Sequence, residues 1–343
     1  MKKVTTSVAQ CLSTEGRRDG VKCAVFFLGR IKKRFPVKQS AARKAVPSSG
    51  SEDTIPTFGG VFSDGAFLEL VRNGASLPPR LLLWDGREQI VDDVVEYRGQ
   101  QHEPHVIHET ILRELKLPAQ VGTSEPVREF LPEICKLIDR FVSLPEKSTA
   151  LVGRFVLATW LVDAMQTAPR MLIQGPDTGR ARQLMQLLHC CCRRALPMSA
   201  VTPAGLCSLP SGMRLTLLLQ QEAISPKLAA VLKAASVRGN PILRAGQLRD
   251  LFGAQVILCD ADFDEEARVA SSIRVPCMPT SGRLPVLNTE LQQRIRGGIS
   301  SQAAGVPLYI LSGCVHDKLR SLEVRDSPAA ACNEPCCRHA GRR

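Results

Sequence analysis

The central part of the chain alternates between short apolar runs and longer runs with helical spacing. Three apolar runs have the length of strands, namely RMLIQG (170–175), LTLLLQQ (215–221) and AQVILCD (254–260). Four runs have helical periodicity: PVREFLPEICKLIDRFV (126–142), ALVGRFVLATWLVDAM (150–165), RQLMQLLHCCCRR (182–194) and PKLAAVLKAAS (226–236). Strands that alternate with helices predict a parallel sheet covered by helices. We therefore expect an α/β domain over residues 124–317, with Ser124 as the cap of its first helix and Ser148 just before the second.

A different pattern precedes this domain. Short apolar or alternating runs, separated by turn-forming dipeptides, predict strands at AFLELV (66–71), RLLLW (80–84) and VVEY (94–97). One amphipathic helix is then expected, starting at Pro104 and continuing through HVIHETILRELKL (105–117). Residues 56–123 are thus predicted to form a small α+β unit.

The two ends lack any sustained pattern and carry the net charge. The chain has 343 residues and a net charge of +12. Residues 1–48 supply +10 and residues 319–343 supply +2, so the part between them is neutral. Residues 1–55 are predicted to be a disordered basic arm and linker, and residues 318–343 a flexible tail.

The basic arm has two open interpretations. The stretch GRIKKRFPVKQSAARK (29–44) can neutralise nucleic-acid phosphates without reading bases, and such binding weakens steeply with salt. The simpler interpretation is a solvated terminus without a specific partner. Its apolar run CAVFFLG (23–29) is too short to span a bilayer, so no membrane association is expected.

The cysteine pattern indicates the redox state of the thiols and, with it, the cellular compartment. Thirteen cysteines, an odd number, include the run Cys190-Cys191-Cys192. This pattern favours reduced, mostly buried thiols and a cytoplasmic location over a set of disulfides.

The turn after the first strand of the α/β domain has the layout of a phosphate-binding loop. Such loops follow the pattern G-x-x-x-x-G-K-[ST], in which backbone N–H groups, a lysine and a hydroxyl hold phosphate and Mg²⁺. Counted from Gly175-Pro176, the last three positions hold Arg180, Ala181 and Arg182. A frame shifted by one residue would align Gly179-Arg180-Ala181 instead, still without a hydroxyl. The simplest interpretation is a strand-to-helix turn in an inherited scaffold.

The order of the neighbouring segments resembles the ATPase domains of phage- and plasmid-type primase–helicase proteins. The resemblance covers about residues 148–280 and is moderately specific as a whole. It rests on Thr159-Trp160, APRMLI (168–173), LMQLL (184–188), VTPAGLCSL (201–209), TLLLQQ (216–221), LKAASVRGNPILR (232–244) and GAQVILCDADFDEEARVASSIRV (253–275). It implies a P-loop NTPase-like, AAA+-like fold. Because LMQLL supports the ungapped frame, Ala181 takes the lysine position.

The resemblance also implies that the catalytic motifs are degenerate. The family strand ends in Asp-Glu, which hold the metal and activate water, whereas this chain has Gln220-Gln221. Where the family tends to carry a functional arginine, this chain has Ser271. A glutamine amide gives Mg²⁺ no formal charge and cannot act as a general base.

Two functional hypotheses follow. The first is a catalytically inactive pseudo-ATPase without a cofactor, acting as a scaffold or accessory factor. It would contact a protein partner, another copy of itself or nucleic acid. The alternative is a divergent enzyme that binds and hydrolyses ATP with Mg²⁺ and uses Arg180 in place of the lysine.

Three further clusters have ligand-type side chains but favour ordinary structural roles. They are His102, His105 and His108 at three-residue spacing; Asp260, Asp262 and Asp264; and Cys332, Cys336, Cys337 and His339. The histidines are expected along a solvated helix edge, the aspartates in a solvated loop and the cysteines in a flexible tail.

Overall fold

The computed structural model describes residues 54–74, 76–85, 89–119, 127–259, 272–278, 290 and 292–293. The predicted tail, its cysteine–histidine cluster, the acidic run from Asp260, and almost all of the predicted arm lie outside these residues. Among the described residues, no helix combines the length and apolar character needed to cross a bilayer.

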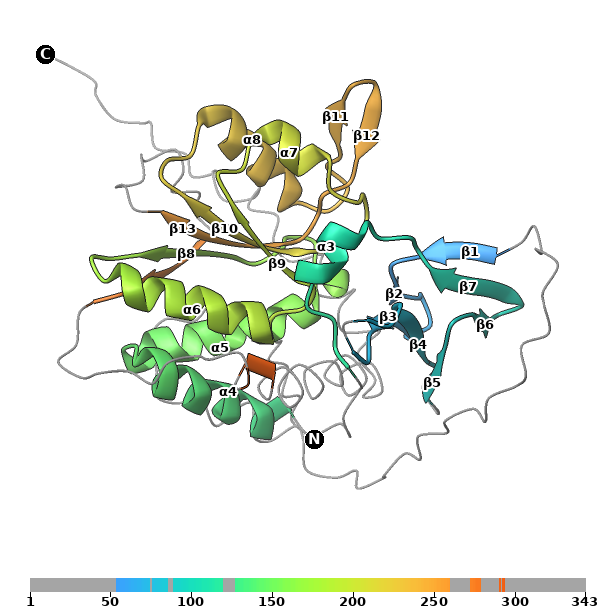
Figure 1. Cartoon of the computed structure of the whole chain (residues 1–343), viewed down its shortest axis with the longest axis horizontal. Helices are drawn as coiled ribbons and strands as arrows, with labels where there is room; N and C mark the ends of the chain where they lie inside the picture. Colours follow the sequence, from blue (N-terminus) through green and yellow to red (C-terminus); the bar gives the residue numbers. More distant parts are fainter. Residues whose placement is uncertain are drawn as a thin grey trace, which may run out of the picture.

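A five-stranded sheet forms the centre of the protein (Figure 1). Its strands are all parallel and lie in the order β14-β8-β13-β10-β9. Their bounds are β8 (Arg170–Gln174), β9 (Ala195–Ser199), β10 (Thr216–Gln221), β13 (Ala254–Cys259) and β14 (Ser272–Pro276). The expected parallel sheet is therefore present, and β8, β10 and β13 match the three apolar runs. The two edge strands, β9 and β14, were not predicted.

Helices cover both faces of this sheet (Figure 1). One face carries α4 (Val127–Val142), α5 (Glu146–Trp160) and α6 (Thr178–Cys191), and the other carries α7 (Pro203–Cys207) and α8 (Pro226–Ala235). Met171 and Ile173 of β8 pack in the core on the α4–α6 side, whereas Leu172 packs in the core on the other side. Successive side chains of a strand point to opposite faces of the sheet, and helices cover both faces. The central strands are therefore apolar throughout.

The N-terminal unit consists of two small sheets and a short helix. The three-stranded sheet has the order β1-β7-β6, and the antiparallel four-stranded sheet has the order β2-β3-β4-β5. The elements are β1 (Thr54–Thr57), β2 (Gly60–Val61), β3 (Phe67–Val71), β4 (Arg80–Trp84), β5 (Gln89–Asp92), β6 (Val95–Tyr97), β7 (Gln100–Pro104) and α3 (Glu109–Glu114). β1 starts inside the segment expected to be the linker. The predicted strands near residues 67, 80 and 95 are confirmed.

The three histidines were predicted to lie along one helix edge, and this prediction was wrong. Pro104 ends β7, and the helix begins only at Glu109. His102 is buried in β7, and burial lowers its pKa. His105 stacks on Phe58 with ring centroids 4.4 Å apart. His108 caps α3 by accepting the Thr110 N–H. The histidines therefore do not share a helix face, and no metal-type cluster occurs among the described residues.

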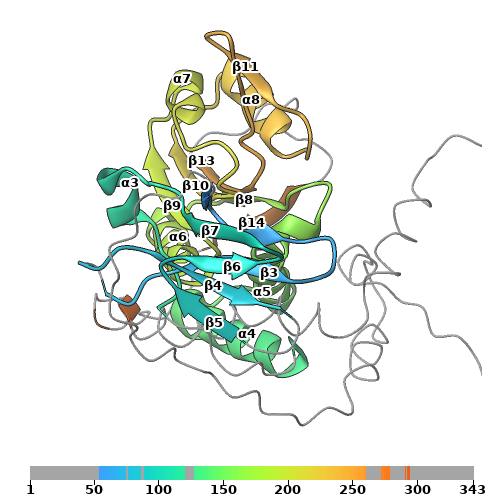
Figure 2. The ribbon, with the colours of Figure 1, turned by 90° about the vertical axis from the view of Figure 1, so that its right-hand side faces the viewer.

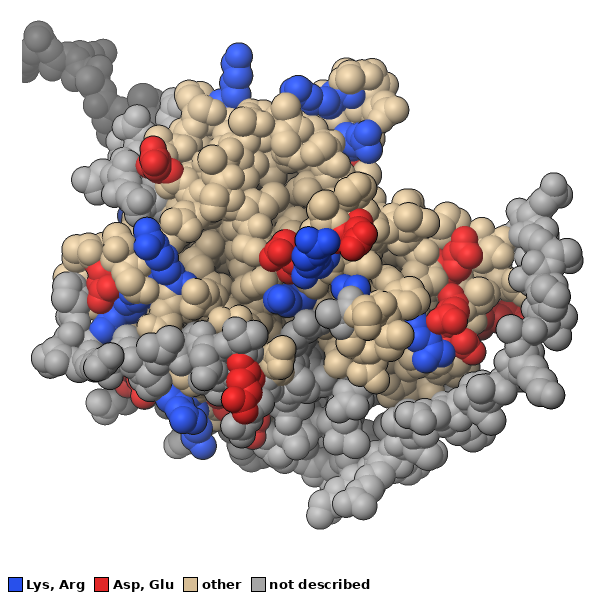
Figure 3. Space-filling view, viewed as in Figure 1, with Lys and Arg blue, Asp and Glu red and all other residues tan. Residues whose placement is uncertain are grey.

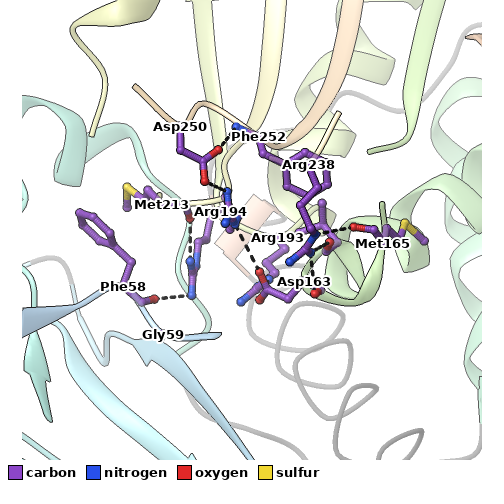
Figure 4. A network of polar contacts seen from close by, with 12 residues as sticks. Phe58, Gly59, Asp163, Met165, Arg193, Arg194, Met213, Arg238, Asp250 and Phe252 are labelled. Atoms are coloured by element: carbon purple, nitrogen blue, oxygen red, sulfur yellow. Dashed lines mark hydrogen bonds and ion pairs between the residues drawn. The ribbon is translucent and has the colours of Figure 1, made fainter. Parts of the chain in front are cut away.

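A buried network of charged side chains joins the N-terminal unit to the α/β domain (Figure 4). Glu69, on β3, accepts hydrogen bonds from Arg193 (2.6 Å) and Arg194 (2.9 and 2.7 Å), which follow α6. The three side chains are at most 3% exposed. Arg194 also donates to the carbonyl oxygens of Phe58 and Met213, one in each unit. A single carboxylate thus accepts hydrogen bonds from two arginines across the junction.

The network continues along the edge of the α/β domain. Asp163, in the short 3-10 helix Val162–Ala164, accepts a hydrogen bond from Arg193 at 2.6 Å. Burial would raise the pKa of Asp163, but Arg193, Arg194 and Arg214 outweigh it and lower that pKa. The carboxylate is therefore held in its charged form, as the neighbouring arginines require.

The central role of Glu69 leads to a stability prediction. Replacing it by glutamine keeps the shape but removes one of the two negative charges, Glu69 and Asp163, that balance the two buried guanidinium groups. We expect Glu69→Gln to lower the free energy of unfolding by about 3 kcal/mol, within the range for breaking a buried ion pair. Glu96→Gln, on the exposed face of β6, should change it by less than about 0.5 kcal/mol. Urea unfolding of the two variants measures the difference, and equal effects would contradict the network's role.

Candidate functional site

The loop that resembles a phosphate-binding loop lies at the carboxyl end of β8. β8 is an interior strand with β14 on one side and β13 on the other. In open parallel sheets, ligands bind beyond the carboxyl ends of such strands, where the strand order reverses. The loop itself is short, because Gly175, Pro176 and Asp177 alone separate β8 from the start of α6 at Thr178.

The carboxylate of Asp177 occupies the N-terminus of α6. Its Oδ1 accepts the Arg180 N–H at 2.9 Å, and its Oδ2 lies 3.4 Å from Arg180 Nε. The Ala181 N–H is also engaged, because it donates to the Asp177 carbonyl oxygen. Pro176 has no N–H to offer. The backbone groups that would cradle a phosphate are thus largely satisfied by the chain itself.

Arg180 points into the protein. Its side chain is 3% exposed, and Nη1 donates to the Ser143 carbonyl oxygen at 3.1 Å, just beyond the end of α4. The following residue, Ala181, is 1% exposed and packs in the core between the sheet and helices α4–α6. Gly175, Pro176, Gly179 and Arg182 are exposed. The sequence-predicted residues therefore divide into a buried pair and an exposed rim, with the carboxylate of Asp177 between them.

Close packing against the end of β14 explains why a glycine occupies position 175. Gly175 has φ 141°, and a Cβ there would lie 2.3 Å from the Cys277 carbonyl oxygen. The Cys277 N–H donates to the Gln174 carbonyl oxygen at 2.7 Å, and its carbonyl oxygen accepts the Asp177 N–H at 3.3 Å. Burial raises the pKa of the Cys277 thiol to about 11, against the opposing effect of Arg180, so the thiol is protonated near neutral pH.

The two glutamines at the end of β10 lie on opposite faces of the sheet. Gln220 shares the face of Leu218, which packs in the α4–α6 core, whereas Gln221 shares the face of Leu219 in the other core. Gln221 is 7% exposed, and its Nε2 has no hydrogen-bond partner among the described residues. Gln220 therefore faces the layer that contains α6, and Gln221 does not. Ser271 lies outside the described residues.

Sequence reasoning missed three residues that shape this site: Asp177, Ser143 and Cys277. Asp177 could have been found, because an aspartate before an amphipathic run is a common N-cap. Ser143 and Cys277 contribute only main-chain atoms to the loop's polar contacts, so their side chains give no signal in the sequence.

Comparison with known proteins finds distant structural likeness and no sequence family. No protein-family model matches the chain, and no curated protein matches its sequence. The apo "A form" structure of the NrS-1 C-terminal region has 12% identity and a TM-score of 0.38, with 70% of this chain and 66% of that chain covered. A second apo structure of that region has 15% identity and a TM-score of 0.37, with 76% and 73% covered. The chain thus spans just under two thirds of the first of these.

The structure of JCV helicase is more distant. It has 11% identity and a TM-score of 0.28, with 58% of this chain and 69% of the helicase chain covered. TM-scores this low carry no argument about function. The parallel sheet between helical layers, which this chain's own strand pairing establishes, is compatible with a P-loop-like fold.

The packing of Gly175 predicts that alanine substitutions at Gly175 and Gly179 have different effects on stability. Gly175→Ala forces a Cβ into backbone atoms at an unfavourable φ, so we expect a loss of at least about 2 kcal/mol in unfolding free energy. Gly179 is helical, and its Cβ would lie 3.4 Å from Asp177 Oδ1. Gly179→Ala should therefore be neutral or slightly stabilising. Thermal unfolding followed by circular dichroism tests this order, and a reversed order would contradict it.

Proposed function

We propose that this protein is a catalytically inactive relative of P-loop ATPases that acts as a scaffold or accessory factor. The observation that carries the proposal is the position of Asp177. Its carboxylate stands at the N-terminus of α6, where a phosphate group would bind, and it pairs with Arg180. A triphosphate entering there would meet a negative charge and donors that are already engaged.

The residues at the motif positions support the same proposal. Ala181 brings no ammonium group to the lysine position, and Gln220 and Gln221 bring no charge for a metal. Loss of one such electrostatic contribution typically lowers a rate by about 10²–10³. Losses at several positions leave little turnover.

The geometry disfavours Arg180 as a substitute for the lysine. To reach a bound phosphate, its guanidinium would have to leave Asp177 and the Ser143 carbonyl oxygen. Nucleotide binding would have to supply the free energy lost with these two contacts. The contacts therefore favour an internal role, in which Arg180 fastens α6 to the end of α4.

Calorimetry with ATP and ADP, each with and without Mg²⁺, tests the proposal. We expect no saturable heat up to millimolar nucleotide for the wild-type chain and no ATP turnover. Asp177→Asn removes the blocking charge but keeps an N-cap side chain, so inorganic phosphate should bind this variant more tightly than the wild type. Magnesium-dependent hydrolysis that disappears in a folded Arg180→Gln variant would contradict the proposal and support a divergent ATPase.

We further propose that the accessory role includes contact with nucleic acid through residues 1–48. These residues carry a charge of +10, whereas residues 49–318 are neutral. Binding should weaken steeply with salt, because each neutralised phosphate releases counterions. Deleting residues 1–48 should remove most of the affinity and flatten the salt dependence, as measured by fluorescence anisotropy with a labelled duplex. Equal affinity and slope in the truncated chain would contradict this part of the proposal.

A further inference from the structure

A histidine is buried in the middle strand of the three-stranded sheet. β7 lies between β1 and β6, and His102 is in register with Ile55 of β1 and Val95 of β6. The residue is 6% exposed. Figure 2 shows β7 and β6 side by side, with β4 and β5 next to them. The imidazole is therefore enclosed by the N-terminal unit itself.

The imidazole has apolar neighbours and no polar partner. Its ring meets the ring of Phe62 edge-on, with centroids 5.8 Å apart. Ile55 and Val95 flank it, because residues in register on neighbouring strands point to the same face of a sheet. Nδ1 and Nε2 are both buried, and neither has a hydrogen-bond partner among the described residues. Burial without a partner costs free energy even for the neutral ring.

The other three histidines that the structure describes have a different environment. Each has one ring nitrogen in a polar contact: His105 Nδ1 lies 3.0 Å from the Val106 carbonyl oxygen, His108 Nδ1 lies 2.8 Å from Thr110 Oγ1, and His189 Nε2 lies 2.9 Å from the Glu114 carbonyl oxygen. The environment of His102 is thus not a general property of the histidines in this chain.

The charged groups around His102 point away from it or are paired with other groups. On β7 and the segments packed against it, the titratable or charged side chains are Asp64, Arg80, Glu96, Tyr97, Arg98 and Glu103. Glu96 and Glu103 each lie one residue beyond a member of the registered pair, so they point to the opposite face. Asp64 accepts a hydrogen bond from Tyr97 and pairs with Arg98. Arg80 pairs with the aspartates at the end of β5, and Figure 3 shows acidic and basic side chains of this unit on the surface.

Protonation of the ring is therefore unfavourable in the folded unit. Burial lowers the pKa of His102 from its ordinary value of 6.5, and no charge on the described residues offsets this effect. A group with a lowered basic pKa binds its proton more readily in the unfolded state. The stability that depends on neutral His102 is thus fully present above pH 6.5 and is lost progressively below it.

The junction with the α/β domain responds to a lower pH range. The arginines around Asp163 lower the pKa of that carboxyl from its ordinary value of 3.8, so Asp163 keeps its charge in mild acid. Between pH 6.5 and pH 3.8, protonation acts on the sheet that contains His102 and leaves the charge of Asp163 in place.

We propose that His102 is a pH-sensitive switch that opens the three-stranded sheet in mild acid. Proton uptake favours a state in which β1 and β7 separate and the imidazolium reaches water. β3 stays docked, because Glu69 remains paired with Arg193 and Arg194. Phe58 follows β1, so the opening also weakens the contact between its carbonyl oxygen and Arg194. The switch lies in the N-terminal unit and operates whether or not the α/β domain binds nucleotide.

Hydrogen exchange of the full chain between about pH 7 and pH 5, followed by mass spectrometry, tests the proposal. After correction for the intrinsic exchange rate, protection of the β1 and β7 amides should fall as the pH falls. The decrease should reach up to about tenfold per pH unit, because the opening takes up one proton. Protection of β3 and of the central strands β8 and β10 should stay constant.

Variants that cannot take up the proton test the role of the ring. In His102→Phe and His102→Gln, the protection of β1 and β7 should be independent of pH over this range. Two variants are used because phenylalanine is larger than histidine and glutamine buries an amide. His108→Asn is the matched control, because His108 is exposed and asparagine keeps an N-cap side chain. This control should retain the pH dependence of the wild type.

NMR titration of the imidazole C–H resonances gives a second readout on the wild-type chain. A His102 pKa below 6.5 supports the switch, and a pKa at or above 6.5 overturns it. Constant protection of β1 and β7 in the wild type overturns it as well, and so does a pH dependence that persists in a folded His102 variant. Equal loss of protection in β3 and β10 would indicate unfolding of the whole chain and would also overturn the proposal.

Discussion

Pairing of buried arginines within the chain is the constraint on which this structure depends. Arg180 pairs with Asp177 beneath the loop, and Arg193 and Arg194 pair with Glu69 across the junction of the two units. An unpaired charge in such places costs several kcal/mol, so each arginine fixes the position of its partner. The first pairing sets the shape of the candidate nucleotide site, and the second makes the N-terminal unit part of the same body.

The same pairings account for the contacts of the loop after β8. In a working loop, the backbone donors and cationic side chain at the helix N-terminus are kept available for the ligand. Here the Asp177 carboxylate accepts the Arg180 N–H, Ala181 packs in the core, and Gly175 packs closely against Cys277. The contacts of the loop are therefore made within the chain, which supports the proposed lack of ATPase activity.

The sequence predicted the parts of the fold that bury apolar side chains on both faces. β8, β10 and β13 are interior strands with continuous apolar runs, whereas the edge strands contain Pro197 and Pro276, which weaken the pattern. The position of the loop was also predictable, but its chemistry was not. Glu69 lies 124 residues before Arg193, and no local pattern reveals such a pair. The helix start was misplaced for a related reason, because Pro104 indicated the first turn of a helix, whereas it ends β7 and α3 begins only at Glu109.

The helix N-terminus after β8 is already occupied by the chain's own carboxylate, that of Asp177. Amide resonances of Thr178 and Gly179, followed by NMR during titration with Mg²⁺ and ATP, test this most directly. We expect their shifts to change only slightly and without saturation. Saturating shifts at both amides at micromolar nucleotide would contradict it, because they would require Asp177 to give way to phosphate.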